Sequence, residues 1–188
     1  MRHLILVRHS IPEIRADLPA AEWQLSEAGR QRCLTLAEEL RALDPAFMVT
    51  SREPKALETG RLVARELHLP VEEHADLHEH DRRDVPLMPS REAFEVLVTR
   101  LFREPDLLVF GRETAVEARE RFTAAVQAVM EQHREGNVAI VSHGTVITLY
   151  VAEATGLDPV PFWRSLGLPA LVVLSWPACE LQRVVRRV

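Results

Sequence analysis

The sequence predicts an α/β fold, a three-layer αβα sandwich built around a mostly parallel sheet. Two runs of four apolar residues, 4–7 and 138–141, have the pattern of strands that helices cover on both faces. Between these and the other predicted strands lie segments whose apolar residues recur at helical spacing. No linker or repeat divides the chain, so we expect one domain over residues 1–188.

Composition excludes several classes of protein. The 188 residues carry 23 basic and 28 acidic side chains, a net charge of -5, so general binding to nucleic acid is not expected. No apolar run reaches the length of a membrane span, and no leader precedes the first strand, which favours a cytoplasmic protein without membrane association. Two distant cysteines, Cys33 and Cys179, indicate neither a disulfide framework nor a metal knuckle.

In the first half of the chain, a polar segment follows the first strand and leads to a helix that Ser26 caps and that has stopped by Pro45. A second strand, 46–50, precedes a helix with Pro54 in its first turn. A third strand runs from Val71 to about His74. The stretch 74–89 is rich in His, Asp, Arg and Pro, which predicts a long functional loop.

In the second half, Ser90 is expected to cap one helix, and Thr114 with Glu117 forms a capping box for a longer one. That longer helix is expected to reach about Glu135, with Gly136 as its C-cap. A buried strand, a helix to about Gly156 and two terminal strands, 170–176 and 181–185, complete the alternation.

The chemistry converges on one edge of the predicted sheet. Val7-Arg8-His9-Ser10 and Val141-Ser142-His143-Gly144 each place a histidine and a small residue directly after a buried strand. The helix that carries Lys55 also starts at this edge, and helix N-termini favour anions. In open parallel sheets the carboxyl ends of the strands form the ligand crevice. Two imidazoles, a guanidinium and an ammonium suit a dianionic phosphoryl group.

These motifs make the chain similar to the histidine phosphatase superfamily, in the branch that includes the cofactor-dependent phosphoglycerate mutases. The Arg-His-Gly signature corresponds to 8–10, the Ser-x-x-x-Arg-Ala-x-x-Thr-Ala element to 51–60, and Leu-x-Glu to 77–79. Ser-His-Gly matches 142–144, and the linking Leu-Ser/Thr-x-x-Gly resembles 25–29. The resemblance covers most of the chain in the right order and implies a phosphoglycerate mutase-like fold.

The resemblance also implies the roles of individual residues. His9 would be the nucleophile that forms a phosphohistidine, and Arg8 would hold nonbridging oxygens. His143 would stabilise charge in the transition state, and Glu79 would exchange a proton with the leaving oxygen and with water. Neither a cofactor nor a metal is expected. The expected substrate-binding residues are Lys55, Ser10, Gly144 and Arg82.

Two residues depart from the family pattern. Ser10 stands in place of Gly, where its hydroxyl would either contact phosphate or only fit the turn. Lys55 stands in place of Arg and replaces a bidentate fork with a point charge. Arg52, Arg82 or Arg83 could supply the missing guanidinium, although each could equally be a solvated loop residue.

The prediction is therefore a phosphomonoester hydrolase, independent of metal, acting on a small phosphorylated metabolite. Mutases of the family close the site with long insertions, and the short segment between Glu73 and Ser90 favours hydrolysis. Mutase-type phosphoryl transfer, or a non-catalytic phosphoryl-binding module, remains the alternative. The His-rich stretch 74–81 also allows a metal-dependent hydrolase, although it lacks HExxH spacing. The oligomeric state is not indicated by the sequence.

Overall fold

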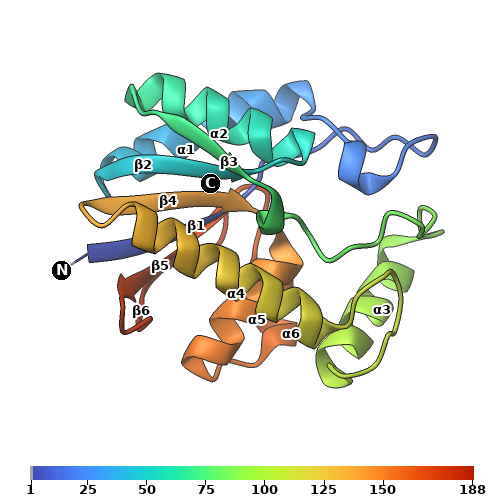
Figure 1. The fold of residues 1–188 in the computed structure, drawn as a ribbon. Helices are drawn as coiled ribbons and strands as arrows, with labels where there is room; N and C mark the ends of the chain where they lie inside the picture. Colours follow the sequence, from blue (N-terminus) through green and yellow to red (C-terminus); the bar gives the residue numbers. More distant parts are fainter. Residues whose placement is uncertain (1) are drawn as a thin grey trace.

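The computed structural model describes residues 2–188, which form a six-stranded sheet with helices on both faces (Figure 1). Its elements, in chain order, are β1 (Arg2–Arg8), η1 (Ala20–Glu22), α1 (Glu27–Arg41), β2 (Pro45–Ser51), α2 (Pro54–Leu67), β3 (Val71–His74), η2 (Ala75–Leu77), α3 (Arg91–Arg103), α4 (Ala115–Gln132), β4 (Asn137–Ser142), α5 (Gly144–Thr155), α6 (Pro159–Ser165), β5 (Ala170–Trp176) and β6 (Leu181–Val185).

The sheet has the strand order β3-β2-β4-β1-β5-β6. The first four of these strands run parallel to one another, whereas β5 is antiparallel to β1 and β6 is antiparallel to β5. The predicted mostly parallel sheet is thus confirmed. The register of the two central strands pairs Val7 with Val141 and Arg8 with Ser142, which brings the residues after both strands to the same level.

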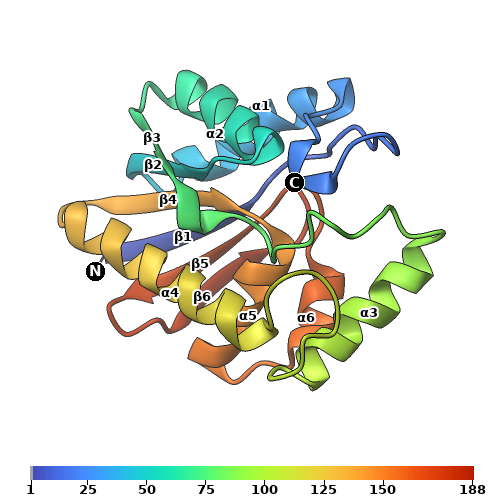
Figure 2. The ribbon, with the colours of Figure 1, turned by 45° about the vertical axis from the view of Figure 1, so that its right-hand side comes forward.

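The two faces of the sheet have separate hydrophobic cores, because side chains alternate along a strand. Ile5 and Val7 pack with residues of α1 and α2, and Leu4 and Leu6 pack with residues of α4, α5 and α6. Figures 1 and 2 show α1 and α2 on one side of the sheet and α4 and α5 on the other. All four side chains are 0% exposed, as expected for a strand buried on both faces.

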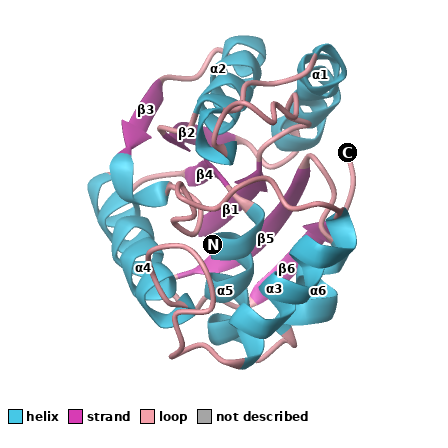
Figure 3. Cartoon of the chain, turned by 90° about the vertical axis from the view of Figure 1, so that its right-hand side faces the viewer, coloured by secondary structure: helices cyan, strands magenta, loops and turns pink. Residues whose placement is uncertain are grey.

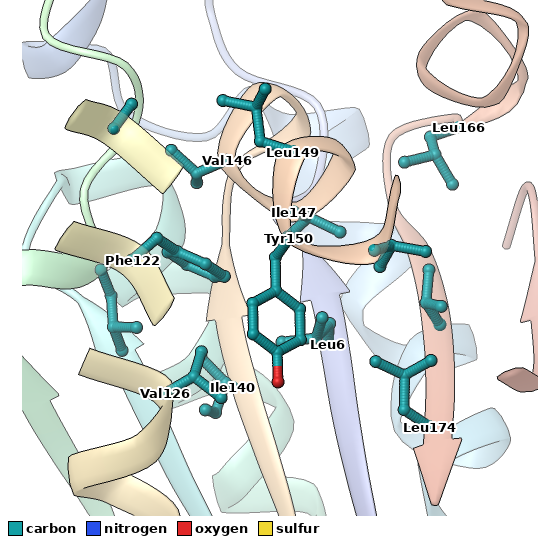
Figure 4. Close-up of a cluster of buried hydrophobic side chains, with 14 of the residues drawn as sticks. Leu6, Phe122, Val126, Ile140, Val146, Ile147, Leu149, Tyr150, Leu166 and Leu174 are labelled. Atoms are coloured by element: carbon teal, nitrogen blue, oxygen red, sulfur yellow. The ribbon is translucent and has the colours of Figure 1, made fainter. Parts of the chain in front are cut away.

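Helix α5 lies at the centre of the larger core. Its residues from Gly144 to Tyr150 are all buried, so this part of the helix is covered on every side rather than amphipathic. Tyr150 of α5 meets Phe122 of α4 with ring centroids 5.9 Å apart (Figure 4). This contact packs the second half of α5 against α4.

The connections after β1 and β4 leave the sheet toward opposite faces, β1 leading to α1 and β4 leading to α5. Adjacent strands whose connections diverge in this way open a crevice at their carboxyl ends. Figure 3 views the molecule from that edge, where β1, β2 and β4 end beneath loops. His9 and His143 come directly after the two strands.

The predicted capping signals are present. The side chains of Ser26, Ser90 and Thr114 accept hydrogen bonds from the first turns of α1, α3 and α4, and Thr114 forms the full capping box with Glu117. Pro54 occupies the first turn of α2. Among residues 2–188, no helix is long and apolar enough to cross a membrane.

Three local expectations were wrong or incomplete. Helix α4 ends at Gln132 with His133 as its C-cap, because Gly136 (φ 73°) is used in the turn into β4 beside Ala46. The short helix α6 was not predicted, since its two prolines obscure helical spacing. In the segment 74–89, His74 is the last residue of β3 and residues 75–77 form one 3₁₀ turn, η2, while the rest is loop.

Candidate active site

The two histidines lie side by side at the carboxyl ends of β1 and β4. The backbone N–H of His9 donates to the carbonyl of Ser142 (3.0 Å), which continues the strand pairing by one residue. The imidazole centroids of His9 and His143 are 5.1 Å apart, with the rings at 63° to one another. Both side chains are buried, so the parallel sheet has brought together two residues that are distant in sequence.

The tautomer of His9 is fixed by its own backbone. Its Nδ1 lies 2.7 Å from the carbonyl oxygen of Ser10, which can only accept, so Nδ1 carries the proton and Nε2 keeps its lone pair. Burial lowers the pKa of His9 well below its ordinary value, and the proximity of His143, Lys55 and Arg8 lowers it further. His9 is therefore neutral and nucleophilic at Nε2 over the physiological range.

Arg8 is the last residue of β1, and part of its guanidinium has no hydrogen-bond partner among residues 2–188. Its Nη1 donates to the carbonyl of Leu166 (2.5 Å), and its buried Nε has no partner within the described residues. Burial lowers the pKa of Arg8 to about 10, against the opposing effect of Glu79. A Cβ on Gly144 would lie 2.9 Å from Cζ of Arg8, so glycine is required for this close approach.

His143 is the N-cap residue of α5 and faces the end of β2. Its Nε2 lies 2.9 Å from Oγ of Ser51 and 3.7 Å from Oε1 of Glu53. Burial and the charge of Lys55 lower the pKa of His143 well below its ordinary value, and Glu79 acts in the opposite direction. An arriving dianion would favour the protonated imidazole, which can then donate to an oxygen of the anion.

Lys55 reaches the same place from the first turn of α2, and its side chain is only 5% exposed. Its Nζ donates to the carbonyl of Ala20 (2.7 Å) and to Oε2 of Glu53 (2.5 Å). Burial lowers the pKa of Lys55, and Glu53 opposes that effect. Two of the three ammonium protons are thus engaged, and one is left for a ligand.

Glu53 is a site residue that the sequence reading did not identify. It precedes α2, and its Oε1 accepts the backbone N–H of Glu79 (2.9 Å) while its Oε2 binds Lys55. The signal was present in the sequence, because a carboxylate two residues before a lysine at a helix start is a natural partner for that lysine. Its position near His143 depends on the packing of β2 against β4 and cannot be read from the sequence.

Glu79 is held by the N-terminus of α5, where its carboxylate accepts hydrogen bonds from free backbone N–H groups. Oε1 accepts from the backbone of His80 (2.9 Å) and Val146 (3.2 Å), and Oε2 accepts from Thr145 (3.2 Å). Burial would raise the pKa of Glu79, but Arg82, His143 and the His80 N–H outweigh it and lower the pKa to about 2. The free protein holds Glu79 as an anion at neutral pH.

Of the three candidate arginines, Arg82 comes to the site. Its guanidinium carbon lies 4.7 Å from the centroid of the Phe94 ring, Nη2 is 3.9 Å from Oε2 of Glu79, and Nη1 is buried without a partner. Arg83 instead forms a two-bond ion pair with Asp81, and Arg52 is exposed at the rim. Arg82 is therefore the guanidinium placed to complement Lys55.

Ser10 is completely buried with its polar groups used inside the protein. Its hydroxyl donates to the carbonyl of Gly29 (2.7 Å), and its backbone N–H donates to Oγ1 of Thr59 (3.0 Å). These contacts favour the second of the two expectations for Ser10, a residue that fits the turn, over a hydroxyl that contacts phosphate.

A pocket of about 310 Å³ opens beside Lys55, Glu53 and Glu79. The histidines 9 and 143 are not among its walls, so it provides room for the part of a ligand next to the phosphoryl position. Charged side chains, histidines and small apolar residues share its walls: Ala20, Ala21, Arg52, Pro54, Ala75, His78, His80, Asp81, Arg82 and Arg83 complete the lining.

The His-rich stretch 74–81 directs its side chains to separate partners. His78 Nδ1 lies 2.7 Å from the carbonyl of Glu79, His80 Nε2 lies 2.7 Å from that of Glu113, and Asp81 pairs with Arg83. Across residues 2–188, no group of three or more His, Cys, Asp or Glu side chains is disposed to hold a metal ion.

A switch-point crevice that holds two histidines beside a cluster of cations has the chemistry to bind a phosphoryl group on an α/β scaffold. The family model for the histidine phosphatase superfamily (branch 1) matches residues 4–186, and the chain belongs to this family. The mostly parallel αβα sandwich is accordingly the phosphoglycerate mutase-like fold.

Individual relatives agree with this assignment. An uncharacterized phosphatase of Bacillus subtilis (strain 168), PhoE, is 28% identical over 145 residues, which are 77% of this chain and 69% of that protein. A mycobacterial glucosyl-3-phosphoglycerate phosphatase with VO3 superposes with a TM-score of 0.78 at 20% identity, covering 100% of both chains. The alpha-ribazole phosphatase of Shigella flexneri gives a TM-score of 0.74 at 20% identity over 98% of this chain and 96% of its own.

Proposed function

We propose that this protein is a phosphomonoester hydrolase that acts on a small phosphorylated metabolite and carries the phosphoryl group transiently on Nε2 of His9. One observation carries the proposal: Nδ1 of His9 is tied to its neighbouring carbonyl, so the unprotonated Nε2 stands among Arg8, Lys55 and His143. A neutral nucleophile surrounded by cations is what attack on a dianionic phosphoryl group requires. Membership of the histidine phosphatase superfamily supports it.

In the first step, Nε2 of His9 forms a bond to phosphorus while the ester P–O bond breaks, and Glu79 gives its proton to the leaving oxygen. In the second, water attacks the phosphorus, Glu79 takes a proton from that water, and the N–P bond breaks to release inorganic phosphate. Glu79 is ionised in the free protein. Glu79 therefore takes up a proton from solvent as the substrate binds, because the phosphoryl charge raises the pKa of a neighbouring carboxylate.

The remaining residues bind and orient the phosphoryl group. Arg8 and Lys55 neutralise its oxygens, and Arg82 adds a guanidinium that Phe94 and Glu79 hold in place. Protonated His143 donates to an oxygen on which charge accumulates. Gly144 leaves the space that Arg8 occupies. All these groups belong to the chain itself, and the proposed steps use only them and water.

The pocket beside the site has a size and lining that suit a small polar leaving group. Its volume, about 310 Å³, and its charged lining suit the organic part of a phosphorylated metabolite better than a large apolar group. Structural relatives named for phosphatase activity toward glucosyl-3-phosphoglycerate and alpha-ribazole phosphate agree with this class of substrate. A cytoplasmic setting and a single domain over 1–188 are part of the same proposal.

Hydrolysis of an aryl phosphate near neutral pH tests the proposal, with a rapid alkaline quench to trap the phosphoenzyme, because the N–P bond of a phosphohistidine is hydrolysed in acid. We expect phosphate release that persists in chelator, alkali-stable labelling of the protein, and loss of both in His9→Ala. His68→Asn, an exposed histidine outside the site, is the matched control and should retain both.

Other outcomes identify the alternatives. Transfer of phosphoryl to a phosphorylated acceptor with little release of phosphate would indicate a mutase. Binding of inorganic phosphate by a folded protein that shows no turnover and no labelling would indicate a binding module and would overturn the proposal. Loss of turnover in chelator, restored by a divalent cation, would indicate a metal-dependent hydrolase.

A further inference from the structure

Lys55 is the only lysine in the chain, because the other 22 of its 23 basic residues are arginines. It stands where the family pattern that the chain resembles has arginine. The proposed site thus holds, at its centre, the one side chain among the chain's lysines and arginines whose charge can be lost in water at accessible pH. This makes the environment of Lys55 decisive for whether the site is charged.

Burial and the helix dipole both disfavour a charged ammonium on Lys55, and the neighbouring carboxylate of Glu53 favours it. The side chain is 5% exposed, and it lies in the first turn of α2, where the helix dipole repels cations. The charged and titratable groups that face it come from several elements. They are Arg82 and Glu79 from the loop after η2, His9 from the end of β1, His143 from the start of α5, and Glu53 from its own helix start.

Glu53 is the carboxylate in direct contact. Its Oε2 is 2.5 Å from Nζ of Lys55, whereas Glu79 has its oxygens committed to backbone N–H groups of His80, Thr145 and Val146. The side chain of Glu53 is itself only 11% exposed, so water screens this pair weakly. Its other oxygen is fixed by the N–H of Glu79, so the carboxylate is oriented as well as charged.

We propose that Glu53 is the resident counter-ion of Lys55: it keeps the buried ammonium charged and aimed at the phosphoryl position while the site is empty. The Glu53–Lys55 pair together then stands in for the arginine of the family pattern. Glu53 acts through Lys55 and is a positioning residue. When a phosphoryl dianion binds, it becomes a second counter-ion on the remaining ammonium proton. The inference rests on the proposed phosphoryl-binding role of this site.

The single lysine allows a direct test that does not require turnover. Protein labelled with ¹³C-lysine gives one Cε signal, whose titration reports the charge of Lys55. In Glu53→Gln we expect that titration to move to lower pH by about one unit or more, because a buried ammonium loses its counter-ion. Glu53→Asp, which keeps the charge, should move it less. Glu73→Gln, which removes an exposed carboxylate paired with Arg61, is the control.

Binding of inorganic phosphate, measured by calorimetry between pH 6.5 and 9.5, gives the functional consequence. At the acid end, Glu53→Gln should bind phosphate as tightly as the wild type or more tightly, since a negative charge has gone. At the alkaline end it should bind about tenfold more weakly, as expected for a one-unit shift of a group that binds the anion. A merely structural defect would weaken binding at every pH. The affinities of the wild type and Glu53→Gln should therefore cross as the pH rises. In Glu53→Gln/Lys55→Arg this crossing should disappear, because arginine keeps its proton.

An unchanged Lys55 titration in Glu53→Gln, or a crossing that persists in the double variant, would overturn the inference. If Glu53→Gln does not fold, Glu53→Asp is compared with the wild type by the same Cε titration. An identical titration in the two proteins would then count against the inference. Absence of turnover with these binding results intact would instead overturn only the proposed hydrolase activity. The two failures are therefore distinguishable.

Discussion

Arg8 passes so close to Gly144 that a Cβ on the glycine would lie 2.9 Å from Cζ of the guanidinium. Gly144 follows β4 by two positions and Arg8 is the last residue of β1, so this contact joins the ends of the two strands that the histidines follow. The free space at Gly144 sets where the guanidinium lies. The contact gives the first prediction.

Gly144→Ala should displace Arg8 and lower kcat/KM by about 10²-fold, the loss that small misplacement of a binding group can cause. The fold should persist, because alanine is favoured over glycine in the first turn of a helix. Steady-state kinetics and thermal unfolding measure the two effects. Ala154→Gly, an exposed change on the same helix, is the control, and equal losses of activity in both variants would contradict the explanation.

Glu79→Gln should slow the hydrolysis of alkyl phosphates much more than that of p-nitrophenyl phosphate. A poor leaving group needs a proton on its oxygen, and a good one does not, so removal of a general acid costs about 10²–10⁴-fold only for the former. Kinetics with a series of leaving groups measures this difference. A uniform loss across the series would show that Glu79 acts on the phosphoryl group or the fold rather than on the leaving oxygen.

The same carboxylate should make stability depend on pH. The pKa of Glu79 is lowered to about 2 in the folded protein from an ordinary value near 4.5. A depressed pKa contributes stability that is fully present above 4.5 and is lost as the pH falls toward 2. A shift of this size corresponds to roughly 3 kcal/mol at neutral pH. Urea unfolding of the wild type and Glu79→Gln should therefore show a difference that shrinks as the pH is lowered.

Because the pKa of His9 is lowered well below its ordinary value, the nucleophile should not lose activity between pH 7 and pH 6. The pH dependence of kcat/KM for an aryl phosphate, which reports ionisations of the free enzyme, measures this directly. A fall with an apparent pKa near 6.5 would indicate that His9 titrates like an exposed histidine. The interpretation of its buried, cation-rich surroundings would then be wrong.

The core around α5 makes a separate prediction about stability. Phe122 is fully buried and packs on Tyr150, so Phe122→Ala should reduce the free energy of unfolding by about 3–5 kcal/mol. Because α4 does not line the pocket, KM of the remaining folded protein should change little. Chemical denaturation and kinetics at low temperature test both statements, with Phe122→Leu as the smaller change.

The sequence by itself determined the scaffold and the approximate position of the site. Apolar runs, helical spacing and capping residues are local signals, so the strands and most helices followed from them. A parallel sheet aligns the carboxyl ends of its strands. For this reason His9, His143 and the start of α2 could be placed on one edge of the sheet from the sequence alone. Helix α6 and the end of α4 were misjudged where prolines and a turn glycine weakened the local signal.

Only the tertiary structure decided which contacts each side chain at that edge makes. The burial of the Ser10 hydroxyl, the commitment of Glu79 to α5, and the choice of Arg82 over Arg83 all depend on contacts between segments far apart in the chain. The pairing of Glu53 with Lys55 is local in sequence, yet its place beside His143 is not. Distances of a few ångströms between such groups fix their charges, and a sequence pattern carries no distances.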